Sequence, residues 1–302
     1  MKRFFALSRT SHGILDLAAP AFCALLWGGQ FPAWNVILLS IFTAFAAYTA
    51  IYALNDLIGM VVDKEKFSKN QLNAGYSVEA SELRYPLARD ILSYKSGLLW
   101  MGFWLILALM GSYLLNPTIV FILIGAALLE IVYCLLLKVT YLRTLVSGFV
   151  KASGPIAAVF VVDPKPSLAP LLIVLVWVYF WEIGGQNVPA DWNDTAEDIA
   201  IHAKTIPIHF GPKKAALIVL GTLTITVITS AFLPLVSPAR LELPYILASL
   251  VIGFVLLLLP SFQLNKERDG RYAAKLFDKA SYYPVAQFVL ISVILAVTAL
   301  IS

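Results

Sequence analysis

Three aspartates with a regular spacing are the feature of this chain most suggestive of chemistry. Asp191, Asp194 and Asp198 follow an apolar segment that begins near Pro170, and they are separated by 3 and then 4 residues. Because an α-helix has about 3.6 residues per turn, this spacing places the three carboxylates on one helical face. Carboxylates held so closely repel one another, and a hard divalent cation such as Mg²⁺, bound through oxygen ligands, would offset that repulsion. We call these residues the second aspartate group.

A related pattern occurs earlier in the chain, where the apolar run 34–54 ends. Asn55 and Asp56 follow this run directly, and Asp63 lies seven positions after Asp56. Asp56 and Asp63 fit the outer positions of the same 3-plus-4 pattern, with Gly59 at its centre. We call Asp56 and Asp63 the first aspartate group. A phosphate-bearing substrate that carries Mg²⁺ would satisfy the charge of both groups.

The composition restricts the class of protein. Of the 302 residues, 60% are hydrophobic and only 13% are charged, and the mean hydropathy is +0.83. A soluble protein of this length could not bury so many apolar side chains. We therefore predict an all-α polytopic membrane protein in which residues 1–302 form a single transmembrane domain. The net charge of +4 reflects lysines and arginines in the loops and indicates no nucleic-acid partner.

About nine apolar segments have the length of roughly 20 residues that a membrane-crossing helix requires. We place them near residues 11–31, 34–55, 92–115, 117–137, 143–162, 168–190, 213–234, 243–265 and 282–301. Asn116 and Pro117 form the only turn signal between the third and fourth segments. We expect the helices to surround a central cavity.

Lysine and arginine residues are distributed unequally between the loops on the two sides. The loops after even-numbered segments hold most of them, whereas the opposite loops hold almost none apart from Lys165 and Arg240. The positive-inside rule therefore predicts that the N-terminus and both aspartate groups face the cytoplasm. The expected location is a membrane, in several passes, and the inner membrane if the protein is prokaryotic.

Several ionisable residues fall inside the predicted segments, where charged groups are costly unless they are paired or functional. They are Asp16, Glu130, Lys151 and Glu182. For Lys151 two interpretations remain open, since it could reach a substrate cavity or pair with Glu130 on the neighbouring helix. Outside the segments, Lys204 lies six residues after Asp198 and is a candidate for binding phosphate.

The two aspartate groups and their surroundings resemble the motifs of the UbiA superfamily of intramembrane prenyltransferases. The family pattern Asn-Asp-x-x-Asp-x-x-x-Asp is matched by Asn55 through Asp63, except that Gly59 replaces the central aspartate. The second family pattern, Asp-x-x-Asp-x-x-x-Asp followed by Lys/Arg-Thr-x-Pro, is matched by the second aspartate group, Lys204, Thr205 and Pro207. The family also has nine helices, with the two motifs at the ends of the second and sixth.

Two further family elements occur with a shift of one residue. The family's Arg-Pro-Leu appears as Arg84-Tyr85-Pro86-Leu87, and its Tyr-x-x-x-Lys element extends here from Tyr133 to Lys138. The resemblance therefore implies that Arg84 and Lys138 contact the diphosphate of a substrate. The absence of a carboxylate at position 59 implies that Asp56, Asn55 or a water molecule takes its place.

The resemblance implies transfer of a prenyl group from a polyprenyl diphosphate to an acceptor, with Mg²⁺ as the cofactor and membrane lipid as the surroundings. The implied metal ligands and catalytic residues are Asp56, Asp63, Asp191, Asp194 and Asp198. The implied substrate-binding residues are Asn55, Arg84, Lys138, Lys151 and Lys204. The acceptor is lipophilic or aromatic, and its identity stays open; an aromatic carboxylate would need a dedicated cation, for which Lys151 and Arg9 are the candidates.

Two other classes of membrane protein have to be compared with this interpretation. An alcohol phosphatidyltransferase requires an Asp-Gly-x-x-Ala-Arg element, which the chain lacks. An ion-coupled transporter is the main alternative, but its coupling carboxylates should lie near the middle of the bilayer. The two aspartate groups instead follow the apolar segments, at one rim of the predicted bundle.

Overall fold

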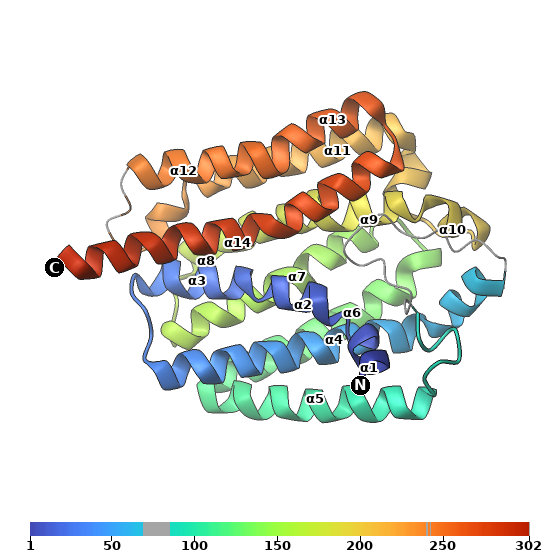
Figure 1. The fold of residues 1–302 in the computed structure, drawn as a ribbon, viewed down its shortest axis with the longest axis horizontal. Coiled ribbons are helices and arrows are strands. Elements are labelled where there is room, and N and C mark those ends of the chain that lie inside the picture. The colour runs from blue at the N-terminus through green and yellow to red at the C-terminus, as the bar shows by residue number, and fades with distance from the viewer. Residues whose placement is uncertain (69–84, 240, 242, 302) are drawn as a thin grey trace.

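The fold is a bundle of long helices that run nearly parallel or antiparallel to one another (Figure 1). The structure, a computed structural model, describes residues 1–68, 85–239, 241 and 243–301. In these residues no strand is present, which confirms the all-α prediction. The first half comprises α1 (Lys2–Leu7), α2 (Thr10–Asp16), α3 (Ala18–Gly28), α4 (Trp34–Ser68), α5 (Tyr94–Leu115), α6 (Pro117–Leu135), η1 (Leu136–Lys138) and α7 (Arg143–Val162).

The second half contains more breaks. Its elements are α8 (Leu168–Trp181), η2 (Glu182–Asn187), α9 (Val188–Asn193), α10 (Thr195–Ala200), α11 (Ile206–Ser230), η3 (Leu233–Val236), α12 (Leu243–Gly253), η4 (Phe254–Leu258), α13 (Leu259–Glu267) and α14 (Gly270–Ile301). Of these, η2 and η4 are π-helical, with hydrogen bonds between residues five apart.

Eight continuous helical stretches in the described residues are long and apolar enough to cross a membrane. α2 and α3, which meet at Leu17 and cover most of the first predicted segment, are each too short to be counted among these eight. Two boundaries differ clearly from the sequence prediction, since α4 continues past residue 55 to Ser68 and α14 begins at Gly270 instead of near 282. Both extensions carry charged residues, which interrupt an apolar pattern without interrupting helical hydrogen bonding.

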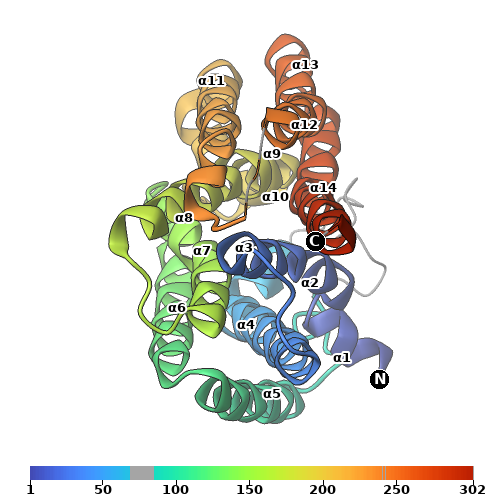
Figure 2. The same cartoon turned by 90° about the vertical axis from the view of Figure 1, so that its left-hand side faces the viewer.

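The interior of the bundle is densely packed on one side. The largest buried apolar cluster joins α3, α7, α8, α11 and α14, and the view along the helices shows these elements grouped together (Figure 2). Trp177 and Tyr283 are both fully buried there, and the indole N–H of Trp177 donates to the Tyr283 hydroxyl over 3.0 Å. On the outside, large apolar side chains such as Leu99 and Phe121 are exposed, as is expected of a surface that faces lipid.

The helix that carries the second aspartate group is interrupted. The sequence predicted one continuous helix through Asp191, Asp194 and Asp198, but α9 ends at Asn193 and α10 begins at Thr195. Asp194 lies at the junction with φ −93° and ψ 9°, and the hydroxyl of Thr195 donates to the Trp192 carbonyl over 2.7 Å. Helical hydrogen bonding nevertheless continues across the junction, because the Asp198 N–H donates to the Asp194 carbonyl over 2.9 Å.

A candidate active site where the two aspartate groups meet

The first aspartate group lies on the part of α4 that extends beyond the apolar run. Asp56 is buried and accepts a hydrogen bond from the Arg9 guanidinium over 3.2 Å. Arg9 also donates to the side-chain carbonyl of Asn55 over 3.3 Å. It can reach both residues because it occupies the break between α1 and α2 in a left-handed conformation, with φ 43°, which is uncommon for residues other than glycine. The N-terminal segment thus contributes a cation to the site.

Lys66 connects the first aspartate group with the second. Its ammonium nitrogen lies 2.7 Å from Asp198, and both side chains are buried, with 7% and 3% of their surfaces exposed. Lys66 is also within electrostatic reach of Asp63 and Asp194. Burial raises the pKa of Asp198, an effect that the neighbouring Lys66 opposes. Lys66 therefore links Asp63 of the first group with Asp194 and Asp198 of the second, although the two groups are more than 100 residues apart in sequence.

Arg143 holds the other end of the second aspartate group. Its guanidinium lies 3.0 Å from one carboxylate oxygen of Asp191, and it is stacked 4.0 Å from the centre of the Tyr133 ring. The Tyr133 hydroxyl in turn accepts a hydrogen bond from the Asn187 amide over 2.8 Å. The cation, the aromatic ring and the amide thereby fix the position of Asp191 at the start of α9.

The donor set fits a hard divalent cation that is ligated in part by something else. In the part of the chain that the structure describes, no group of three Asp, Glu, His or Cys side chains converges closely enough to hold a metal by itself. However, the second carboxylate oxygen of Asp191 is buried and has no hydrogen-bond partner. Mg²⁺ commonly takes only one or two protein carboxylates and completes its shell with water and substrate phosphates. The available oxygens match that mode of binding.

The residues that were predicted to bind phosphate do not all contact the aspartates. Lys138 lies 2.5 Å from Glu65, which keeps it next to the end of α4. Lys204 is exposed, and its contact with the rest of the site is through its backbone N–H, which donates to the Leu137 carbonyl over 2.8 Å. Arg84 lies outside the described residues. Among the described residues, Arg9, Lys66 and Arg143 instead contact Asp56, Asp198 and Asp191 directly.

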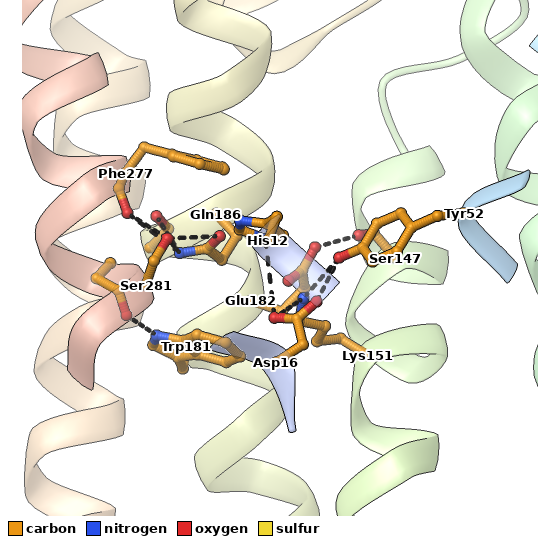
Figure 3. Close-up of polar contacts among 12 residues, drawn as sticks. His12, Asp16, Tyr52, Ser147, Lys151, Trp181, Glu182, Gln186, Phe277 and Ser281 are labelled. Atoms are coloured by element: carbon orange, nitrogen blue, oxygen red, sulfur yellow. Dashed lines mark hydrogen bonds and ion pairs between the residues drawn. The ribbon is translucent and has the colours of Figure 1, made fainter. Parts of the chain in front are cut away.

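Three of the four ionisable residues inside the predicted segments, Asp16, Lys151 and Glu182, form a second polar cluster (Figure 3). The Lys151 ammonium lies 2.7 Å from Asp16, so the predicted alternative of a Lys151–Glu130 pair is wrong. The Tyr52 hydroxyl also donates to Asp16, and the Ser147 hydroxyl donates to Glu182 over 2.6 Å. Glu130 accepts from the Asn55 amide and belongs with the first aspartate group.

A cavity of about 810 Å³ connects the two polar regions. Near the aspartates its wall includes Asn55 and Asn187, and its other end reaches Phe31 and Trp34 beyond the middle of the bundle. Lys151 lines this cavity, which confirms one of the two interpretations of that residue. Most of the remaining wall is apolar, so the cavity suits a hydrocarbon chain whose polar end lies at the aspartates.

Comparison with known proteins agrees with this geometry. The family model of the UbiA prenyltransferase family matches residues 17–297. The chain belongs to the UbiA prenyltransferase family. This membership confirms the resemblance that the two aspartate motifs indicated. No curated protein sequence matches the chain significantly.

Solved structures share the fold of this UbiA family member at low sequence identity. A UbiA homologue from Aeropyrum pernix K1, in its apo form, has a TM-score of 0.72 at 17% identity and covers 94% of this chain and 98% of its own. A UbiA homologue from Archaeoglobus fulgidus bound to DMAPP and Mg²⁺ has a TM-score of 0.67 at 16% identity, with 96% and 99% covered. A digeranylgeranylglyceryl phosphate synthase has a TM-score of 0.65 at 17% identity, with 97% of both chains covered.

Lys66 and Arg143 are two cations of the site that the sequence indicated only as loop charges. Their spacing from other polar residues could have identified them. Arg143, Ser147 and Lys151 recur every four residues and therefore share one face of α7. Lys66 follows Asp63 by three residues and continues the polar face of α4. In this member of the UbiA prenyltransferase family, a polar stripe that continues along an apolar helix was the signal for these residues of the candidate site.

Proposed function

We propose that this protein transfers a prenyl group from a polyprenyl diphosphate to an acceptor inside the membrane, with Mg²⁺ as the cofactor, and releases diphosphate. The observation that carries the proposal is the contact of the two aspartate groups through Lys66, together with an apolar cavity that reaches Asn55 and Ala190, the sequence neighbours of Asp56 and Asp191. The family membership supports the reaction, and the fold shared with a homologue bound to DMAPP and Mg²⁺ supports the donor and the cofactor.

In this proposal the aspartates bind the donor's polar end through the metal. Asp56, Asp63, Asp191, Asp194 and Asp198 would hold Mg²⁺, which supplies positive charge to the leaving diphosphate. The allylic carbon–oxygen bond breaks, and its electron pair leaves with the diphosphate. Cationic side chains stabilise the same leaving group as its charge grows, and we assign this role to Lys66, Arg143 and Arg9, together with Lys138, Lys204 and Arg84. The neutral amide of Asn55 would donate a hydrogen bond to the same group.

The cavity then protects the allylic cation from water. Its wall beyond the aspartates includes Tyr48, Tyr52 and Phe277, whose ring faces can stabilise a cation, and apolar side chains that exclude solvent. The acceptor captures the cation in this region. We further propose that the aspartate end of the bundle faces the cytoplasm, as the distribution of lysine and arginine predicts.

The test is release of diphosphate by the purified protein in lipid vesicles. Geranyl or geranylgeranyl diphosphate is mixed with the protein and Mg²⁺, and diphosphate is measured with and without a chelator. We expect release that depends on Mg²⁺ and that is lost in Asp191→Asn. An exposed carboxylate provides the matched control, since Asp269→Asn at the start of α14 should retain release. Ion transport across the vesicles without diphosphate release would favour the transporter alternative instead.

A further inference from the structure

The π-helical turn η2 places three polar residues, Glu182, Gln186 and Asn187, on the wall of the cavity. Glu182 and Asn187 are its first and last residues, and both line the cavity. Five residues correspond to about one turn of a π-helix, whereas in an α-helix of 3.6 residues per turn they would point in clearly different directions. π-Helical turns of this kind are frequent at functional sites. The turn therefore aligns Glu182 and Asn187 along the same cavity.

Two glycines let this turn pack tightly against its neighbours. A Cβ atom on Gly184 would lie 2.2 Å from the Thr222 hydroxyl of α11, and one on Gly185 would lie 2.9 Å from the Ala280 side chain of α14. Larger residues would push η2 away from both helices. The sequence Glu-Ile-Gly-Gly-Gln-Asn thus supports the turn from behind while its polar residues face the cavity.

Glu182 and Asn187 each present a side-chain oxygen that lacks a partner. One carboxylate oxygen of Glu182 accepts from Ser147, but the other is buried and has no hydrogen-bond partner. The side-chain oxygen of Asn187 is likewise buried without a partner, although its amide nitrogen donates to Tyr133. Each residue is more than nine-tenths buried, with 7% and 5% of its surface exposed. Buried acceptors left without a donor are costly, which points to a ligand that supplies hydrogen-bond donors.

The charges around Glu182 select against an anionic ligand. The cations that line the cavity in the described residues are Arg9 and Lys151, and they are paired with Asp56 and Asp16 respectively. A carboxylate on the acceptor would have to displace Asp16 from Lys151 and would lie close to the Glu182 carboxylate. An uncharged hydroxyl group neither displaces Asp16 from Lys151 nor repels the Glu182 carboxylate. It also brings the hydrogen-bond donor that the oxygens of Glu182 and Asn187 lack.

We propose that Glu182 and Asn187 form the acceptor subsite, that the acceptor is an uncharged alcohol or phenol, and that Glu182 is its general base. This proposal rests on the prenyl transfer proposed above. The acceptor oxygen forms the new carbon–oxygen bond with the allylic cation that remains after the bond to diphosphate has broken. The hydroxyl proton passes to the free oxygen of Glu182, so that charge and atoms balance without a further reactant.

The position of the subsite relative to the second aspartate group agrees with this role. Asn187 precedes Asp191 by about one helical turn, and Glu182 lies a further π-helical turn before Asn187. This interval leaves room for a metal-bound diphosphate and the first carbon of the prenyl chain between Asp191 and Glu182. Glu182 then lies on the prenyl side of the reacting bond, where the acceptor has to approach.

The test compares two acceptor probes in vesicles with geranylgeranyl diphosphate and Mg²⁺. 4-Butylphenol is uncharged, whereas 4-hydroxybenzoate has the same phenol with an added carboxylate. We expect the aryl ether of 4-butylphenol as the product, and a kcat/KM for 4-hydroxybenzoate at least tenfold lower. A preference for 4-hydroxybenzoate, or a product alkylated on a ring carbon, would overturn the assignment.

Variants separate the acceptor subsite from the donor site. Glu182→Gln should lower kcat for ether formation by about 100-fold or more, the usual contribution of a general base, with diphosphate release in the absence of acceptor unchanged. Asn187→Ala should raise the acceptor KM by about tenfold, the value of one hydrogen bond. Glu267→Gln, the same change at the end of α13 outside the cavity wall, should leave both steps unchanged.

The outcomes distinguish this proposal from the one on which it rests. Diphosphate release without ether formation would overturn the subsite alone, and so would normal ether formation by Glu182→Gln. If the wild-type protein released no diphosphate from any donor, the proposed prenyl transfer and the acceptor subsite would both be overturned.

Discussion

The amino group of Lys66 lies 2.7 Å from a carboxylate oxygen of Asp198, and this contact joins α4 to α10. The pair is buried, and Asp63 and Asp194 lie within its electrostatic reach. A lysine in this position neutralises part of the acidic site before any metal arrives. The same lysine would compete with a metal for Asp198 and, once released, could contact the diphosphate that the metal brings. We therefore expect Lys66 to couple the stability of the protein to metal binding.

Replacing Lys66 should make the protein depend on metal for its stability. In Lys66→Ala, Asp198 loses its buried partner, a change that costs about 3–5 kcal/mol when the remaining charge stays uncompensated. Thermal unfolding monitored with and without Mg²⁺ should show a large loss without the metal and partial recovery with it. Lys64→Ala is the matched control, because Lys64 pairs with Asp90 at an exposed position and should change stability little. Equal behaviour of the two variants would contradict this coupling.

Arg143 should not be replaceable by lysine. The guanidinium bonds to Asp191 and stacks on the Tyr133 ring at the same time, and a lysine ammonium lacks the planar shape that permits both. Arg143→Lys should lower Mg²⁺-dependent diphosphate release by about 10- to 100-fold, the usual effect of disturbing a residue that orients a metal ligand. Arg271→Lys, at an exposed pair with Asp269, should have wild-type activity. A fully active Arg143→Lys would mean that charge alone suffices at this position.

The orientation in the membrane can be tested with single cysteines in a protein without Cys23 and Cys134. Ala196 in α10 and Ser167 before α8 are both exposed and lie on opposite sides of the intervening span. An impermeant thiol reagent should label Ala196→Cys only in inverted vesicles and Ser167→Cys in intact cells. The reverse pattern would place the aspartate end of the bundle outside the cytoplasm.

Local rules explain why the sequence predicted the helices and the aspartate motifs. Apolar runs of sufficient length indicate membrane helices, and the 3-plus-4 spacing of Asp191, Asp194 and Asp198 is visible without any structure. The interruption of the helix at Asp194 was not predicted, since neither proline nor glycine marks it. Its cause is local competition from the Thr195 hydroxyl, which bonds to the backbone of α9.

The pairing of charges depended on tertiary packing and could not be predicted. Asp16 and Lys151 are separated by 135 residues, and nothing in either segment favours this pair over Lys151 with Glu130. Which carboxylate meets the lysine is decided by how α2, α6 and α7 pack. The π-helical turn at Glu182 is a similar case. Its two glycines occur in many kinds of local structure, and the need for them is seen only from their close packing against α11 and α14.

Gly59, where the family pattern has an aspartate, provides the test of the first aspartate group. A Cβ atom built on Gly59 would meet only the Asp63 carboxylate, at 3.3 Å, so no neighbouring helix fills this position. Gly59→Asp would add a carboxylate next to Asp63. Without metal the two carboxylates repel each other, which should lower the thermal stability of the variant. A Mg²⁺ ion shared by the two carboxylates should instead raise its stability above that of the wild-type protein.

Gly59→Asn separates charge from size in this experiment. Asparagine has nearly the same volume as aspartate and a similar helix propensity, and replacing glycine by either inside a helix favours the helix by a few tenths of a kcal/mol, about the same for both. The asparagine variant should therefore show no added repulsion without metal and a smaller gain with it. The Mg²⁺ concentration for half-maximal diphosphate release should fall in Gly59→Asp and stay near the wild-type value in Gly59→Asn. An unchanged or higher concentration in Gly59→Asp would mean that position 59 is not a vacant metal-ligand position. The metal would then be held by Asp56 and the second aspartate group, with no ligand at position 59.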